Sequence, residues 1–213
     1  MKERVTIALS KGRILEDSLP LLRRAGIVPA EDPLESRRLV LETSEPGVHV
    51  VIIRASDVPT YVRYGAADIG FAGKDVLLEN GDGDLYELFD LGIARCRLVV
   101  AKPGRDREMP KARIRPRVAT KYPNITHRFF TARGVQADIV KLYGSMELAP
   151  IVGLADRIVD LVSSGKTLQA NGLVEVDQIA SVSAWLVANK AAMKLKHDRM
   201  TSVMERLEQA VQA

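Results

Sequence analysis

Short apolar runs alternate with longer amphipathic segments along the first part of the chain. Residues 5–9 form an apolar run with β-branched side chains, which is typical of a strand, and the apolar positions that follow recur at helical spacing from Ile14 to Ala25. The same alternation then recurs, with strands expected at 49–53 and 68–72 and helices expected from Ser56 and over 74–78. Strands that alternate with helices predict an α/β protein with largely parallel strands.

The second part of the chain repeats this pattern after a break. Glycines and polar residues at 80–84 interrupt the periodicity and indicate a lobe boundary near residue 90, and a second polar loop is expected at 103–110. Three strands are expected next, each before a helix: 117–120 before 125–133, 137–141 before 147–151, and 157–162 before 166–171. A strand at 179–187 and a long amphipathic helix at 193–211 complete the prediction.

Composition and charge narrow the class of protein. Hydrophobic residues make up 46% of the 213 residues and charged residues 27%, which is ordinary for a globular protein. The net charge of +4 and the pI of about 9.2 could suggest nucleic acid, but the cations are spread among the acids and only 5% of residues are aromatic. Arginines placed around phosphorylated small molecules explain the charge equally well, so we expect no nucleic-acid partner.

The N-terminal segment and the cysteine content indicate the cellular compartment of the protein. The first apolar run has only about five residues, too few for a signal sequence or a membrane span. Cys96 is the single cysteine, so no intrachain disulfide is possible. We therefore expect a cytoplasmic protein with no membrane partner.

A loop after the strand expected at 157–162 carries the strongest local signal. The strand contains one acid, Asp160, and the helix that follows begins among small hydroxyl residues and a glycine, an arrangement that can present N–H groups and hydroxyls to a phosphate. A Walker A loop is excluded, because it would need glycine where Asp160 stands. A helix cap that satisfies only its own backbone explains the spacing equally well. The loop residues are Ser163, Ser164, Gly165, Lys166 and Thr167.

Cations also follow the strands expected in the first lobe. Lys11 and Arg13 flank Gly12 after the first strand, and Arg54 follows the strand at 49–53. Parallel sheets bind ligands at the carboxyl ends of their strands, so these side chains are suitably placed for phosphates, although solvated surface cations would look the same. Arg37 lies in a polar turn where surface charge is the default interpretation. The three histidines are not paired at metal-ligand spacing, so no dedicated metal site is expected.

Taken together, several segments resemble one family, the ATP phosphoribosyltransferases that open histidine biosynthesis. The resemblance extends in family order from residue 5 to about 187, which is more specific than any single motif. The matching segments are 8–14, 54–62, 65–70, 73–75, 119–122, 142–150 and 153–173.

This resemblance implies a fold, a reaction and a set of partners. The family transfers the 5-phosphoribosyl group from phosphoribosyl pyrophosphate to N1 of ATP, and its fold resembles a type II periplasmic binding protein, with the active site in the cleft between two α/β lobes. We then expect lobe I at 1–89 plus 174–213 and lobe II at 90–173. Mg²⁺ would arrive on the substrate phosphates. Because the chain reaches Ala213 just after its last expected helix, it resembles the short form, which works as a catalytic homodimer with a regulatory subunit related to histidyl-tRNA synthetase, in a hetero-octamer with four chains of each kind.

The resemblance also implies roles for the candidate residues. Asp160 and residues 163–167 would hold the ribose 5-phosphate, with Glu147 near the ribose. Lys11, Arg13 and Arg54 would face ATP or pyrophosphate. Arg13 and Arg37 would stabilise charge in catalysis, and Arg37 could reach the site across the homodimer.

Overall fold

The chain forms two compact units, each with its own sheet. The computed structural model describes residues 4–81, 83, 85–104 and 115–213, and the units are Met1–Ala94 with Ser183–Ala213 (unit 1) and Arg95–Val182 (unit 2). The crossings expected near residues 90 and 173 therefore come later, at 94/95 and 182/183. The second shift arises because strand β10 (Leu173–Val182) pairs with β6 (Cys96–Pro103) along its whole length, which keeps it in unit 2. Much of the loop expected at 103–110, and residues 82 and 84 of the first expected break, lie outside the described residues.

Unit 1 contains a six-stranded mixed sheet of order β2-β3-β1-β4-β11-β5. The central strand β1 is parallel to β3 and β4, whereas β2 and β11 run antiparallel to their neighbours. Its strands are β1 (Val5–Ser10), β2 (Val40–Glu42), β3 (Val48–Ile53), β4 (Ile69–Gly73), β5 (Leu85–Asp90) and β11 (Ala184–Asn189), and its helices are α1 (Arg13–Arg24), the 3₁₀ turn η1 (Ala55–Asp57), α2 (Val58–Arg63), α3 (Lys74–Asn80), α7 (Lys190–Leu195) and α8 (His197–Gln212).

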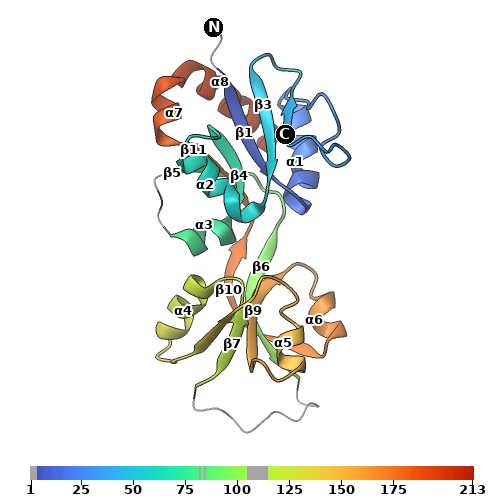
Figure 1. Ribbon diagram of the computed structural model, residues 1–213, viewed down its shortest axis with the longest axis vertical. Coiled ribbons are helices and arrows are strands. Elements are labelled where there is room, and N and C mark those ends of the chain that lie inside the picture. Colours follow the sequence, from blue (N-terminus) through green and yellow to red (C-terminus); the bar gives the residue numbers. More distant parts are fainter. Residues whose placement is uncertain (1–3, 82, 84, 105–114) are drawn as a thin grey trace. The chain divides into compact units, whose positions relative to one another are not determined.

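Helices cover both faces of this sheet (Figure 1). Alternate side chains of β1 point to opposite faces, so Ile7 and Leu9 join the core with α1 and α8, while Ala8 joins a second core with α2. Gly70 of β4 permits the close approach of α2, because a Cβ there would lie 2.7 Å from Val58 Cγ1. Both faces of the central strands are thus buried, which explains their nearly continuous apolar sequence.

A partly buried ion pair attaches the C-terminal helices to this sheet. Lys196, between α7 and α8, places Nζ 2.8 and 2.9 Å from the two carboxylate oxygens of Asp68. The Asp68 side chain is only 6% exposed and also accepts the backbone N–H of Thr6 at 2.8 Å. The pair is therefore a fixed structural contact.

Unit 2 contains a five-stranded sheet of order β10-β6-β9-β7-β8. Strands β7, β8 and β9 are parallel, and β6 and β10 are antiparallel to their neighbours. The remaining elements are β7 (Arg117–Thr120), β8 (Asp138–Lys141), β9 (Arg157–Val162), α4 (Pro123–Thr131), α5 (Leu148–Ile151) and α6 (Lys166–Ala170).

Most of the expected elements are present, but β2, β5 and β6 were not expected, and the long helix expected at 193–211 is divided at Lys196 into α7 and α8. The strand expected at 179–187 is instead the end of β10 and the start of β11, separated at Ser183 where the chain passes into unit 1. A mainly apolar segment does not reveal that its two halves belong to different sheets.

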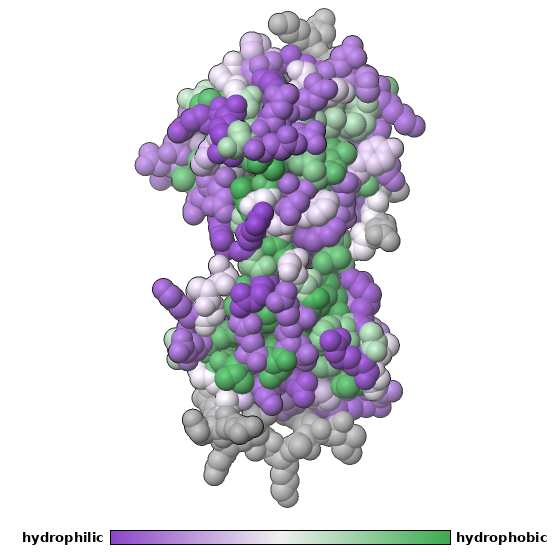
Figure 2. Space-filling view, turned by 180° about the vertical axis from the view of Figure 1, so that it is seen from behind, coloured by the Kyte–Doolittle hydropathy of each residue, from purple (hydrophilic) through white to green (hydrophobic). Residues whose placement is uncertain are grey.

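The surface is mainly polar, with apolar areas visible on the face of unit 2 in Figure 2. Exposed large apolar side chains in this unit include Val174 and Val176 of β10, at 45% and 38% exposure. Within the described ranges, no helix is both long and apolar enough to cross a membrane.

Candidate active site

The loop between β9 and α6 turns at a glycine with a left-handed backbone. Gly165 is the N-cap residue of α6, with φ +77°, in the left-handed region that other residues enter only with strain. Ser163, Ser164, Lys166 and Thr167 are all exposed around it. The loop therefore presents hydroxyls, an ammonium group and backbone N–H groups to solvent.

The alternative of a purely capped helix fits this geometry poorly. Gly165 has no side chain to cap the helix, and the Ser164 hydroxyl lies 3.5 Å from the N–H of Lys166, at the outer limit of a hydrogen bond. A capping serine normally accepts a shorter bond from the first turn. The side chains of Ser164 and Thr167 are exposed to solvent beside this glycine.

An ion pair that the sequence does not indicate lies beside this loop. Arg97 of β6 donates from Nη2 to Glu175 of β10 at 2.9 and 3.2 Å, and its Nη1 lies 3.5 Å from the carbonyl oxygen of Ser163. A Cβ at Gly165 would stand 3.6 Å from Glu175 Oε1. Arg97 therefore contacts the loop at Ser163, and the Glu175 carboxylate lies close to Gly165.

Asp160 lies within β9, before the loop. It is partly buried, and its Oδ1 accepts the N–H of Leu161 at 2.8 Å. The interpretation as an acid near the ribose phosphate is compatible with this position.

Glu147 lies at the same edge of the unit 2 sheet. Because β7, β8 and β9 are parallel, the segments that follow them emerge together. Glu147 follows β8 at the start of α5, and Ser145 just before it adopts a positive φ of 51°. Thr120 at the end of β7 donates to Val159 O at 2.8 Å and accepts Tyr122 N–H at 2.9 Å, so it holds this edge together, a role that the sequence analysis does not identify.

Lys11 and Arg54 emerge side by side in unit 1. Ser10 of β1 is level with Ile53 of β3, and the N–H of Lys11 donates to Ile53 O at 3.0 Å. Gly12 turns the chain with φ +88° into α1, whose first residue is Arg13. The exposed Arg13 side chain lies 3.7 Å from Asp17. These three predicted cations therefore share one edge of the unit 1 sheet.

Arg37 lies at this edge too, one strand farther out. Strand β2 runs antiparallel to β3 and begins beside its carboxyl end, where Ile52 N–H donates to Leu39 O at 2.8 Å. Arg37 is exposed, two residues before Leu39. Its neighbour Arg38 pairs instead with Glu31 at 2.9 Å.

Three further residues at the same edge are missing from the sequence-based assignment of the site. Lys74 and Asp75 follow β4, and Asp75 is 6% exposed although it is charged. A Cβ on Gly73 would lie 2.2 Å from Asp75 Oδ1, so the Asp75 carboxylate packs closely against this glycine. The buried Ser10 hydroxyl has no hydrogen-bond partner among the described residues. The rule that predicted Lys11, that parallel sheets bind ligands at the carboxyl ends of their strands, also applies to these three residues.

The fold and these loops define a class of protein: a two-lobed α/β protein with exposed hydroxyls and cations at the carboxyl edges of both sheets, suited to phosphorylated small molecules. Within residues 4–81, 83, 85–104 and 115–213, no group of three or more His, Cys, Asp or Glu side chains could hold a metal ion. The sequence model of the ATP phosphoribosyltransferase family matches residues 54–209. The chain belongs to the ATP phosphoribosyltransferase family.

Curated relatives agree over the whole chain. The chain is 57% identical to an ATP phosphoribosyltransferase of Acidithiobacillus ferrooxidans, covering 99% of both sequences. It is 60% identical to that of Methylococcus capsulatus, covering 98% of this chain and 97% of the relative. These relatives therefore have the length expected of the short form.

Solved structures confirm the fold. The chain superposes with a TM-score of 0.83 and 35% identity on a chain of the ATP phosphoribosyl transferase (HisG:HisZ) complex from Thermotoga maritima, covering 98% of each. It also superposes with a TM-score of 0.58 on the periplasmic aliphatic sulphonate binding protein of Escherichia coli, covering 99% of this chain and 69% of that protein at 15% identity, which bears on the fold alone. The predicted type II periplasmic-binding-protein-like fold is confirmed.

Proposed function

We propose that the loop 163–167 binds the 5-phosphate of phosphoribosyl pyrophosphate and that the cations at the unit 1 edge bind ATP and pyrophosphate. The activity is that of the family: the chain transfers the phosphoribosyl group to N1 of ATP, giving phosphoribosyl-ATP and pyrophosphate in the first step of histidine biosynthesis. The observation that carries the site assignment is the positive φ of Gly165 among exposed hydroxyls.

The reaction needs little acid or base catalysis from side chains. The bond from the ribose C1 to the pyrophosphate oxygen breaks, and a bond from C1 to adenine N1 forms through a state with oxocarbenium character. Adenine N1 is already a nucleophile, so the protein contributes position and charge. Glu147 supports the ribose in this assignment, while Arg13 and Arg37 stabilise the charge that develops on the departing pyrophosphate.

Magnesium fits this scheme as a partner of the substrates. Mg²⁺ keeps several waters and binds phosphate oxygens readily, so it needs few protein ligands. When bound, it neutralises charge on the leaving pyrophosphate. Asp160 at the unit 2 edge and Asp75 at the unit 1 edge are acidic groups that would meet the ion through its water shell.

The assembly is proposed on similar grounds. We propose that the chain forms a catalytic homodimer within a hetero-octamer with a regulatory subunit, because its relative from Thermotoga maritima was solved as a HisG:HisZ complex. Exposed apolar side chains beside the edge strand β2 support contact with another chain, with Leu34 at 52%, Leu39 at 56% and Val40 at 58% exposure. We place the protein in the cytoplasm, where ATP is abundant.

Product formation tests the function directly. The chain is incubated with ATP, phosphoribosyl pyrophosphate and Mg²⁺, and phosphoribosyl-ATP is followed by its absorbance. Product is expected in at least one of two incubations: the chain alone, or the chain together with the regulatory subunit. Its absence in both cases would overturn the proposal, while omission of either substrate is the blank.

A further inference from the structure

The chain leaves unit 1 after Ala94 and returns to it at Ser183. The two connecting segments are hydrogen-bonded to each other, because the N–H of Ala184 donates to the carbonyl oxygen of Ile93 at 3.0 Å. The carbonyl oxygen of Ser183 accepts the N–H of Lys74 at 2.9 Å, at the carboxyl end of β4. Both connections between the units therefore start from one anchored point in unit 1.

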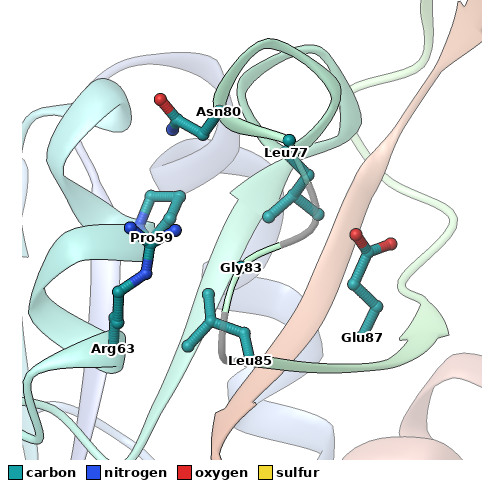
Figure 3. Close-up of a pocket in the computed structure, with 8 residues that line it drawn as sticks. Pro59, Arg63, Leu77, Asn80, Gly83, Leu85 and Glu87 are labelled. Atoms are coloured by element: carbon teal, nitrogen blue, oxygen red, sulfur yellow. The ribbon is translucent and has the colours of Figure 1, made fainter.

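The anchor of the returning segment, Lys74, is itself held by its side chain. Its ammonium group pairs with Glu87 of β5 and lies 4.4 Å from the ring centroid of Trp185 in β11. Glu87 stands beside β11, with which β5 pairs (Figure 3). This side of the anchor is thus built into the sheet of unit 1.

The outgoing segment depends on a different contact. Ala94 has a positive φ of 53°, a left-handed conformation that alanine adopts only with strain. Its N–H donates to Oδ2 of Asp17 in α1 at 2.9 Å. A carboxylate makes such a bond stronger than a neutral acceptor does. Asp17 therefore holds Ala94 in a conformation that the residue would not otherwise prefer.

The same oxygen of Asp17 faces Arg13. The Nε of Arg13 lies 3.7 Å from Oδ2, one helical turn away, and the two side chains are 51% and 38% exposed. An exposed pair at this separation contributes little to stability, so the pair alone gives Asp17 no clear structural purpose. Asp17 does, however, link a cation of the candidate active site to the point where the chain leaves unit 1.

We propose that Asp17 is a positioning residue for the reaction, which holds Ala94 at the start of the crossing and Arg13 at the unit 1 edge through one carboxylate oxygen. This inference rests on the proposed function, in which the phosphoribosyl group bound by unit 2 must reach the ATP bound by unit 1. The conformation of the connecting chain then determines how well the two substrates align, and misalignment lowers the rate of the chemical step. Because each unit binds its own substrate, the proposal predicts a larger effect on kcat than on either KM.

Substitutions in the whole protein separate the two contacts of Asp17. Asp17→Ala removes the acceptor and should lower kcat roughly tenfold, with either KM changed less than about threefold. Asp17→Asn keeps an oxygen for the N–H of Ala94 and should retain kcat within about threefold. Ala94→Gly, added to Asp17→Ala, should restore most of the lost kcat, because glycine adopts a positive φ without strain.

Glu16→Ala is the matched control for these variants. Glu16 is an exposed acid one position before Asp17 on the same helix, so its removal changes the charge of α1 by the same amount. Its kcat and KM values should equal those of the wild type. All kinetics are measured at a temperature at which circular dichroism shows every variant to be folded.

Hydrogen exchange of the Ala94 amide tests the contact without reference to activity. In protein labelled with [¹⁵N]alanine, the Ala94 signal is assigned by its loss in Ala94→Gly. Its exchange should be slow in the wild type and in Asp17→Asn, and at least about tenfold faster in Asp17→Ala.

The outcomes distinguish this inference from the proposed function. Equal exchange in the wild type and Asp17→Ala would overturn the inference, and so would a loss of kcat that Ala94→Gly does not reduce. An equal loss of kcat in Asp17→Asn and Asp17→Ala would also overturn it, because the effect would then come from charge beside Arg13. Wild-type protein that forms no product would contradict the proposed function instead, whatever the exchange rates show.

Discussion

The positive φ of Gly165 gives the sharpest test of the phosphate loop. Replacing Gly165 by alanine adds one methyl group, which would meet Glu175 Oε1 at 3.6 Å and Val162 Cγ1 at 3.9 Å, both ordinary contacts. Packing therefore tolerates the methyl group. The conflict lies in the backbone, because φ is +77°.

The size of the effect follows from that conflict. An L-residue in the left-handed region costs roughly 1–2 kcal/mol, and the stiffer unfolded chain offsets about 0.4–1 kcal/mol of it. A net loss of about 1 kcal/mol lowers the melting temperature by roughly 2–4 °C in a protein of this size. If the backbone of the variant moves out of the left-handed region to relieve the strain, one charge-assisted hydrogen bond to the phosphate is lost. That bond contributes about 1.5–3 kcal/mol to binding. The KM for phosphoribosyl pyrophosphate then rises roughly 10- to 150-fold.

Gly134→Ala is the matched control for this experiment. Gly134 follows α4 in the same unit with φ +70°, and a Cβ there would have no neighbour within 4 Å. Both variants should lose similar stability in scanning calorimetry, while only Gly165→Ala should raise the KM for phosphoribosyl pyrophosphate in the product assay. Equal KM values in the two variants, at equal stability, would refute the assignment of the loop.

Three further variants test other parts of the structure. Arg13→Ala should lower kcat at least about tenfold with an unchanged melting curve, because its side chain is half exposed; unchanged kinetics would remove it from the site. Lys196→Met leaves Asp68 buried without its cation and should reduce the free energy of unfolding by about 3 kcal/mol in urea denaturation, with kcat retained; a loss below about 1 kcal/mol would contradict a fixed pair. Arg97→Gln should raise the KM for phosphoribosyl pyrophosphate, whereas Glu175→Gln should lower it, since the two changes alter the charge beside the loop in opposite directions; shifts in the same direction would show that the pair acts only through structure.

The sequence predicts the parallel core of each unit well, because those strands are buried on both faces. Strands β1, β4 and β9 read as apolar runs before glycine turns and were found at their expected positions. Strand β2 has three residues with one buried side chain, and β10 exposes most of its length, so neither shows a periodic signal. These edge strands are specified by the neighbours with which they pair.

The same difference separates the site residues that were predicted from those that were not. Lys11 and Arg54 follow strands with clear apolar runs. The rule that parallel sheets bind ligands at the carboxyl ends of their strands therefore predicts both residues. The position of Arg37 depends on the register of β2, and the pair of Arg97 and Glu175 joins residues 78 positions apart across two antiparallel strands. Such contacts come from pairing and register, which local sequence does not encode.

The family resemblance and the geometry support the phosphate loop in different ways. From spacing alone, residues 163–167 fit a capped helix and an anion site equally. Family membership supplies a phosphate for them, while the structure weakens the rival interpretation, since the hydroxyl of Ser164 is 3.5 Å from the nearest first-turn N–H and its side chain is exposed. The phosphate proposed for this loop would account for both the glycine turn and the exposed hydroxyls.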